Sequence, residues 1–360
     1  LDQHKEELRG IRQEPEVIVP LPNETKESFF SGINQLLDSG RNQRFAVFQT
    51  LILTNTQMAH GSSIEKFGLQ IKHKQHFNLI GRVGGRFVCE TERVVTGTNS
   101  LSTNEYLDCR AYAMLLDAVL RFEPILEVFR LLESLSIAYS TFTSALYTSL
   151  DTAPKAVQSC FNNFKSDLVD EMHETEAEVI EYMRANEDNY SHGRKGGGNL
   201  RYSNMLWTDH FEATFEWVFI TLRSVLDENV EMVSQINNIE KYLRNTYLDR
   251  FKSSAPQDVM ETFEYDIKRW AESDNPVLLT QFSSPTTFNF EKTLISDIDA
   301  LTIWQDLGFK LDKKLSAKPS GYQNRLFLTR LRRNIINLSH REKDPNANDA
   351  SLPLVGKLAL

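Results

Sequence analysis

The chain has 360 residues, of which 41% are hydrophobic and 25% charged, an ordinary composition for a folded protein of about two domains. A formal net charge of −9 argues against general attraction to nucleic acid phosphate, and no apolar run is long enough for a membrane span. The three cysteines, Cys89, Cys109 and Cys160, are far apart and form no CxxC pair. This pattern predicts free thiols in a reducing cytoplasm rather than a zinc site or a disulfide framework.

A strand-helix-strand pattern comes first in the chain. The apolar run at 16–21 predicts a buried strand, and the run at 45–53 predicts another. Between them, four apolar residues recur with the spacing of one helix face: Phe29, Ile33, Leu36 and Leu37. Strands that alternate with a helix in this way are typical of a parallel sheet.

A hairpin and then a long helical region follow. The strand-like runs 77–83 and 86–96 are joined by Gly84-Gly85, and a two-glycine turn suits a tight hairpin because both positions can take positive φ. Ser102 and Glu105 form a capping-box pattern, which predicts a buried helix from there to Val119.

The rest of the chain is predicted to be mainly helical. Apolar spacing predicts a helix that has Pro154 at its first position, and further helices at 209–225, 227–250 and 257–272. The last unit is predicted to contain a strand near 286–290, a helix to Leu307 that Gly308 ends, and a basic helix from Gly321 to about Leu338.

The N-terminal segment resembles a known family. The stretch V-I-V-P-L-P-N-E-T at 17–25, followed by K-E-S-F, resembles the late-barrel signature I-V-G-L-P-G-E-T of radical S-adenosylmethionine enzymes, which a helix beginning T-x-E-S/T-F follows. The run at 45–53 and the sequel T-N-T-Q-M at 54–58 resemble the next strand, which usually ends in P-G-T-x-M. The segments 86–95, 98–102 and 106–110 resemble the post-barrel region of members that carry an N-terminal cobalamin-binding domain. The resemblance covers most of residues 1–335.

The resemblance implies a fold. We expect an α+β protein in which 1–76 is the end of a partial β/α barrel, comprising its last two strand-helix units. A β-hairpin connector at 77–100 and a helical domain at 101–275 should follow. A small strand-helix-helix unit at 276–340 and a loose tail at 341–360 complete the expected division.

The resemblance also implies a chemistry that this chain lacks the means to perform alone. The family cleaves S-adenosylmethionine reductively at a 4Fe-4S cluster held by a CxxxCxxC triplet, and no such triplet is present. The chain opens without Met, in what reads as the end of a helix. We therefore expect an upstream part that holds the cluster and a cobalamin-binding domain for methyl transfer or redox chemistry. The expected substrate is a small molecule or is bound to a carrier.

The family's cofactor lies at the carboxyl ends of the barrel strands. The resemblance therefore places a set of residues near S-adenosylmethionine: Leu21, Pro22, Asn23, Glu24, Thr25, Gln49 and Leu53. For Glu24 the alternative role is stabilisation of a helix N-terminus. For Gln49 the alternative is a buried amide that a neighbouring group satisfies.

Some positions depart from the family pattern. Pro20 and Asn23 replace glycines of the barrel signature, and Thr54-Asn55-Thr56 replaces the usual P-G-T turn. Because asparagine tolerates positive φ better than other non-glycine residues, we expect both turns to be retained.

Other features have competing interpretations. A group of four acidic residues and one histidine could supply metal ligands: Glu171, His173, Glu174, Glu176 and Glu178. The sequence shows no second Glu-x-x-His helix to complete a di-metal site, so a solvated helix face is the simpler interpretation. His73 and His76 lie in a charged connector and are expected at the surface.

The alternative for the whole chain is a non-catalytic helical binding protein with a strand-helix-strand scaffold. A closed N-terminal layer would favour that alternative, whereas an apolar, unpaired sheet would favour a barrel with missing strands.

Overall fold

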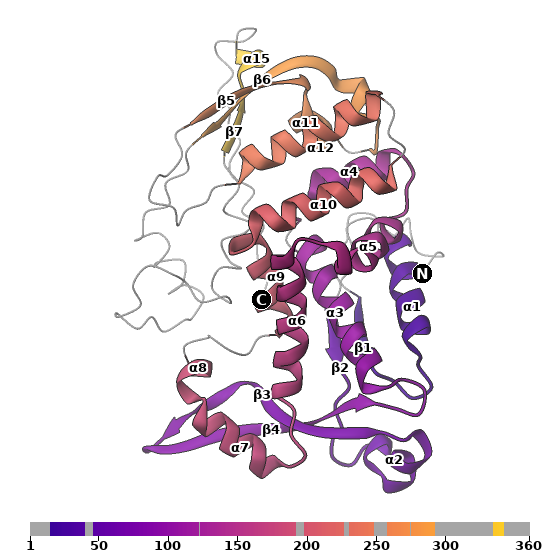
Figure 1. Cartoon of the computed structure of the whole chain (residues 1–360), viewed down its shortest axis with the longest axis vertical. Coiled ribbons are helices and arrows are strands. Elements are labelled where there is room, and N and C mark those ends of the chain that lie inside the picture. The colour runs from indigo at the N-terminus through magenta and orange to yellow at the C-terminus, as the bar shows by residue number, and fades with distance from the viewer. Residues whose placement is uncertain are drawn as a thin grey trace.

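The computed structural model is a mixed helix and strand protein with a large helical layer between small sheets (Figure 1). It describes residues 15–39, 46–121, 123–191, 198–226, 230–247, 258–273, 275–291 and 334–341. Within these ranges no helix is long and apolar enough to cross a membrane.

The N-terminal unit is a two-stranded parallel sheet and one helix that lies between its strands in the sequence. Strands β1 (Glu16–Val19) and β2 (Ala46–Gln49) pair in parallel, and α1 (Lys26–Asp38) connects them. The predicted helix face is confirmed, because Phe29, Ile33 and Leu37 are buried and Leu36 is partly buried against the same core. After β2 the chain forms two short helices, η2 (Gln57–Ala59) and α2 (Gly61–Phe67).

A long antiparallel hairpin joins this unit to the helices. Strand β3 (Gln70–Val83) pairs with β4 (Arg86–Gly97), and the turn glycines Gly84 and Gly85 have φ values of 57° and 78°. The predicted turn is confirmed, although β3 begins earlier than predicted. Leu51, just after β2, bridges to Val94 of β4, so the hairpin is attached to the parallel sheet.

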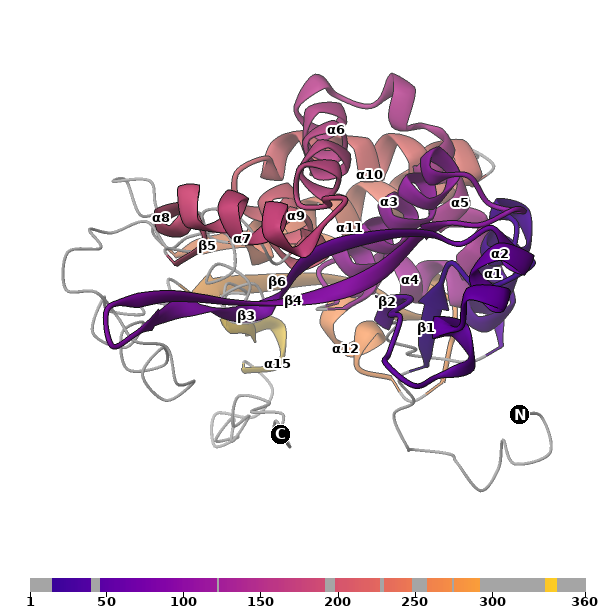
Figure 2. The ribbon, with the colours of Figure 1, turned by 90° about the horizontal axis from the view of Figure 1, so that it is seen from below.

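The helical layer is built around one buried helix. Helix α3 (Thr103–Leu120) begins at the predicted capping box of Ser102 and Glu105, and every residue from Ala111 to Val119 is buried. Figure 2 shows the helices gathered on one side of the β3–β4 hairpin. The other helices of this layer are α4 (Leu126–Ser134), α5 (Tyr139–Thr148), η3 (Leu150–Thr152), α6 (Lys155–Asp170), α7 (Glu176–Ala185), α8 (Glu187–Ser191), α9 (Gly198–Thr208), α10 (Phe211–Val225) and α11 (Val230–Thr246).

A three-stranded antiparallel sheet, of order β5-β6-β7, lies at the opposite end of the molecule from the hairpin (Figure 1). Its strands are β5 (Val259–Tyr265), β6 (Ser283–Glu291) and β7 (Asn334–Asn337). Short helices accompany it: α12 (Ile267–Ala271), η4 (Leu279–Phe282) and α15 (Leu338–Arg341). The strand predicted near 286–290 is confirmed as part of β6.

Two helix predictions in this region are wrong. The segment predicted as a helix at 257–272 contains β5 and only the short α12, because Phe263 and Tyr265 are buried with the alternation of a strand. The end of the predicted basic helix is β7, which pairs with β6. The helix predicted to end at Leu307, the beginning of the basic helix and the tail from 342 lie outside the described residues.

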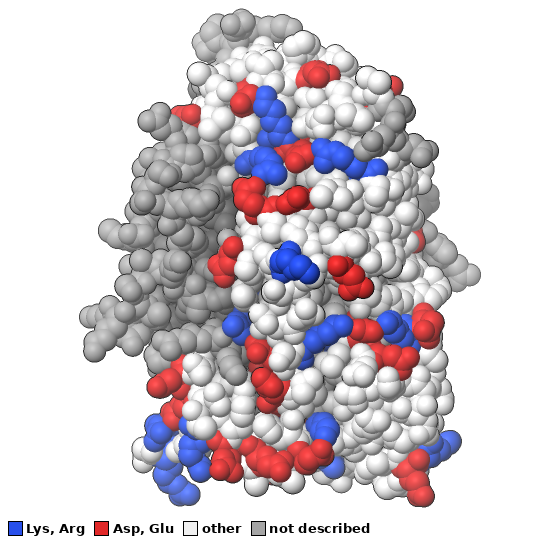
Figure 3. Space-filling model, in the orientation of Figure 1, with Lys and Arg blue, Asp and Glu red and all other residues white. Residues whose placement is uncertain are grey.

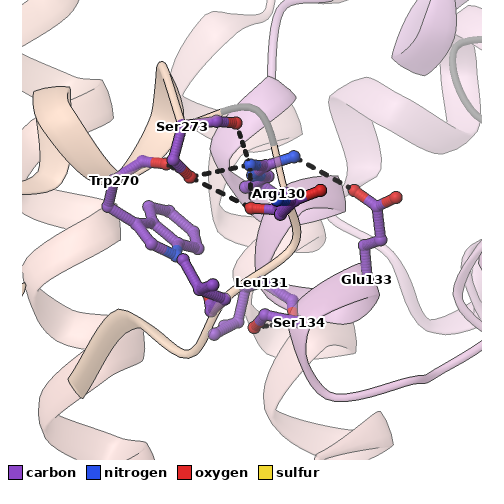
Figure 4. Close-up of polar contacts among 8 residues, drawn as sticks. Arg130, Leu131, Glu133, Ser134, Trp270 and Ser273 are labelled. Atoms are coloured by element: carbon purple, nitrogen blue, oxygen red, sulfur yellow. Dashed lines mark hydrogen bonds and ion pairs between the residues drawn. The ribbon is translucent and has the colours of Figure 1, made fainter. Parts of the chain in front are cut away.

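Arg130 of α4 fastens the helical layer to the segment after α12 (Figure 4). Its guanidinium donates to the Ser273 hydroxyl at 2.8 Å and to the Asn275 carbonyl at 2.5 Å, and it pairs with Glu133 at 3.4 Å. The indole of Trp270 is fully buried beside it and donates to the Val277 carbonyl at 2.8 Å. These bonds fix the segment after α12 against α4.

Candidate functional site

The candidate site consists of the two turns that follow β1 and β2. The strands are parallel and adjacent, so their carboxyl ends lie at one edge, and the Thr50 amide donates to the Val19 carbonyl at 3.0 Å. In these turns Asn23 has φ 66° and Asn55 has φ 67°. Both asparagines occupy positions where the family pattern has glycine, and both adopt the left-handed conformation that glycine favours. The expectation that asparagine preserves these turns is confirmed.

The Leu21–Glu24 turn is closed by its own hydrogen bonds. The Glu24 amide donates to the Leu21 carbonyl at 3.1 Å, and the Leu21 amide donates to Glu24 Oε2 at 3.0 Å. Thr25 caps α1 in a capping box with Ser28. The Glu24 carboxyl is half-buried, and this burial raises its pKa, whereas the hydrogen bond from Leu21 lowers it. The Glu24 side chain therefore stabilises the turn, and the Thr25 side chain caps the N-terminus of α1.

Two side-chain hydroxyls from outside the Leu21–Glu24 turn form hydrogen bonds at its two ends. Thr50 Oγ1 donates to the Pro20 carbonyl at 2.6 Å, and Ser100 Oγ donates to the Glu24 carbonyl at 2.8 Å. Ser100 lies between β4 and α3, in a turn where the Thr98 amide donates to the Leu101 carbonyl. No sequence pattern indicates that Thr50 or Ser100 bonds this loop. The only signal for Ser100 was its place within the 98–102 segment that resembles the post-barrel region.

The two faces of the β1–β2 sheet differ sharply in exposure. Val17, Val19 and Val47 pack on the helical core, whereas the register partners Ile18 and Phe48 on the other face are 45% and 49% exposed. Within the described residues, one face of the parallel sheet therefore presents a half-exposed apolar surface.

Exposed apolar residues continue from this face into the turns at the strand ends. Leu21 is 42% exposed and Leu53 is 58% exposed, so both predicted site leucines are at the surface. Gln49 is the register partner of Val19 and is buried, so its side chain is not presented to the open face. Its Nε2 has no hydrogen-bond partner among the residues that the structure describes. Pro22 and Asn23 lie in the turn between Leu21 and Glu24, with Asn23 exposed.

Asp108 of α3 joins the first turn of α1 to α6 close to this loop. Its carboxylate accepts from Lys26 at 2.5 Å and from Lys165 at 2.6 Å. Partial burial raises the pKa of Asp108, but the hydrogen bonds from Lys165 and Lys26 outweigh it, so the pKa lies below its ordinary value. The hydrogen bond to Asp108 raises the pKa of Lys26.

The cysteines of this chain do not fit the ligand set of an iron–sulfur cluster. Cys89 lies on β4, Cys109 on α3 and Cys160 on α6, and each is a free thiol. Burial raises the pKa of Cys109 and of Cys160 to about 12. Cluster ligation requires thiolates, which such environments disfavour. Across the described ranges no three or more His, Cys, Asp or Glu side chains are grouped to hold a metal ion.

Surface charge gives no support to a polyanion-binding interface on the face drawn in Figure 3. Lys and Arg side chains there are interspersed with Asp and Glu rather than gathered in a broad basic field. Phosphate backbones bind best to clustered cations.

No protein-family model matches the chain, and a comparison with curated proteins finds no significant relative.

Proposed function

We propose that this chain is the C-terminal part of a radical S-adenosylmethionine enzyme, and that β1, α1 and β2 belong to the end of its β/α barrel. An upstream part would hold the 4Fe-4S cluster, and a cobalamin-binding domain there would extend the chemistry to methyl transfer or redox reactions. The cluster supplies the electron for reductive cleavage of S-adenosylmethionine when it is bound. The proposed substrate is the one that the resemblance implies, a small molecule or a group bound to a carrier.

The uncovered face of the β1–β2 sheet carries this proposal. In a β/α barrel, one face of each strand packs on helices and the other faces the packed barrel interior. Val17 and Val47 make the first kind of contact here, while Ile18 and Phe48 have the apolar character of interior residues and are 45% and 49% exposed in the described part of the chain. Parallel strands are apolar on both faces because both are normally buried. Covering these two half-exposed side chains would contribute roughly 1 kcal/mol each.

The residues of this chain would bind and orient the substrate rather than perform redox chemistry. The Leu21–Thr25 loop and Leu53 lie at the carboxyl ends of the two strands, where barrel enzymes place their substrates. Asn23 presents an amide side chain at this edge, and Leu21 and Leu53 present apolar surface. Gln49 lies on the face of the sheet that packs on the helical core, so it would contribute to that packing instead of contacting a ligand.

The alternative is a non-catalytic helical binding protein. For such a protein we expect an N-terminal layer whose apolar residues are all buried within the chain itself. The exposure of Ile18 and Phe48 favours the barrel proposal instead.

Reading the transcript upstream of Leu1 is the first test. We expect an in-frame coding region with a CxxxCxxC triplet and a cobalamin-binding domain. An in-frame stop just before Leu1, with no cysteine triplet on the same message, would reject the proposal in favour of the binding protein.

The second test uses the full-length protein after anaerobic reconstitution. We expect formation of 5′-deoxyadenosine, and we expect Phe48→Ser to reduce it several-fold because Phe48 would line the barrel interior. The matched control is Ile220→Ser on α10, an apolar residue that is 57% exposed and distant in sequence from the site. Equal effects of the two variants, or no product from the wild type, would contradict the proposal.

A further inference from the structure

Two buried hydrogen-bond donors on α3 lack acceptors, and the proposed function does not involve them. Tyr106 and Arg110 lie four residues apart, so their side chains share one face of the helix. The Tyr106 side chain is fully buried, and within the described residues its hydroxyl has no hydrogen-bond partner. The Arg110 Nε is also buried without a partner there. Buried donors without acceptors are uncommon in proteins, so this face of α3 requires an explanation.

The two donors lie close together but cannot satisfy each other. Burial raises the pKa of Tyr106, and the neighbouring Arg110 guanidinium acts in the opposite direction. A guanidinium has only donors, so it cannot accept the hydrogen of the Tyr106 hydroxyl. Both groups therefore need an acceptor from elsewhere, and one small ligand with oxygen atoms would serve both.

The positive charge of Arg110 has no carboxylate partner within the described ranges. A terminal nitrogen of its guanidinium donates to Asn199 Oδ1 of α9 at 2.9 Å, and this acceptor is neutral. No carboxylate of the described residues forms an ion pair with Arg110, although its side chain is partly buried. Buried charges in proteins are normally paired. Asn199 thus orients the guanidinium and leaves its charge and its Nε–H for another partner.

A second cation, Lys74 of β3, lies near Arg110. Burial lowers the pKa of Lys74, and repulsion from Arg110 lowers it further. Lys74 Nζ lies 3.4 Å from Glu92 Oε1 of β4, and an ammonium group has three hydrogens, so donors remain after this contact. The Lys74 side chain is 25% exposed, so the cluster is open to solvent on the hairpin side.

The neighbouring carboxylates do not supply the acceptor for Arg110. Glu92 and Glu171 both attract Lys74, and neither forms an ion pair with Arg110. Glu171 lies in the connector between α6 and α7. Glu171 and His173 of this connector are partly buried, in contrast to the solvated helix face expected from the sequence.

We propose that Tyr106, Arg110 and Lys74 form a binding site for a small oxoanion, a carboxylate or a phosphate group. Its oxygens would accept from the Tyr106 hydroxyl and the Arg110 Nε–H, and its charge would offset the repulsion between Arg110 and Lys74. A water molecule could accept from both donors, but it would leave the charge of Arg110 unbalanced. The site lies where α3 and α9 cover the β3–β4 hairpin (Figure 2), and it is independent of the proposed barrel.

Titration of the chain with inorganic phosphate and with acetate tests this site. We expect at least one of them to bind saturably in isothermal titration calorimetry, with a dissociation constant of about 1 mM or tighter. Binding should also raise the midpoint of thermal unfolding relative to chloride at equal ionic strength. The anion that binds more tightly identifies the group that the site prefers.

Tyr106→Phe separates binding from stability. The substitution should weaken anion binding by about tenfold, because a hydrogen bond to a charged acceptor is lost. Without the anion it should not lower the unfolding midpoint, because the hydroxyl bonds no acceptor within the described chain. Tyr190→Phe is the matched control. The Tyr190 hydroxyl of α8 donates to Glu171 Oε1 at 3.1 Å, so its removal should lower the midpoint and leave anion affinity unchanged.

The proposal is overturned if neither anion binds saturably up to about 10 mM, tenfold above the expected dissociation constant. Equal affinities of the wild type and Tyr106→Phe would also overturn it, as would an equal loss of affinity in Tyr190→Phe. Should Tyr106→Phe fail to fold, Arg110→Lys decides the question, because it keeps the charge and removes the Nε–H. Full anion affinity in Arg110→Lys would then reject the site.

Discussion

At the scale of single residues, the loop after β1 shows which features a sequence can predict and which it cannot. The left-handed φ of Asn23 and Asn55 was predictable, because few residues other than glycine tolerate that conformation. The roles of Thr50 and Ser100 were not, because each hydroxyl bonds a carbonyl far away in the sequence. Serine and threonine are too common at turns and helix ends for their presence alone to indicate a partner.

We predict that Ser100→Ala loosens the Leu21–Glu24 turn. The substitution leaves the partly buried Glu24 carbonyl without its donor, which costs about 1–2 kcal/mol locally. Hydrogen exchange at the Leu21 and Glu24 amides should therefore become faster by roughly tenfold. Ser100→Thr keeps the hydroxyl and should restore slow exchange. If the alanine variant exchanges as slowly as the wild type, Ser100 does not hold the loop.

At the scale of elements, local patterns predicted the elements that are stabilised locally. Helix α3 has a capping box and a continuous buried stretch, and the β3–β4 turn has two glycines. Strand β5 was mistaken for a helix because its stability depends on pairing with β6, and no short-range pattern reports such a partner. The alternation of Phe263 and Tyr265 with polar residues was the available signal.

The contact among α1, α3 and α6 leads to a prediction about pH. Asp108→Asn should lower the free energy of unfolding at neutral pH by about 1–2 kcal/mol, because Lys26 and Lys165 lose a charged acceptor. The pKa of Asp108 is lowered in the folded state, so its contribution is present above the ordinary value of 3.8 and is lost as the pH falls below it. Urea unfolding at about pH 7 and about pH 3 should thus show a difference that shrinks in acid.

Asp170, an exposed carboxylate at the end of α6, provides the matched control for this measurement. Asp170→Asn should change the unfolding free energy by no more than about 0.5 kcal/mol. Equal destabilisation by the two substitutions would mean that Asp108 contributes no specific bridge between the three helices.

At the scale of the whole molecule, stability should be concentrated in the helical layer. Helix α3 is buried over most of its length and packs on several neighbours, whereas β1 and β2 share four register pairs and leave one face open. A two-stranded sheet is marginal in water without further cover. The sequence predicts the same ranking, because two parallel strands leave ladder groups and apolar faces uncovered, whereas the helices after Ser102 can bury each other.

We therefore predict that hydrogen exchange in the chain is much faster before residue 60 than between 103 and 132. Amides in the interior of α3 should exchange only through global unfolding, because opening this helix would expose the centre of the core. Amides of β2, such as those of Val47 and Phe48, should exchange through local opening of the open-faced sheet. Mass spectrometry of peptides from both regions gives the comparison. Equal or stronger protection in β2 would mean that the N-terminal unit is self-sufficient, which would count against the barrel proposal and favour the binding-protein alternative.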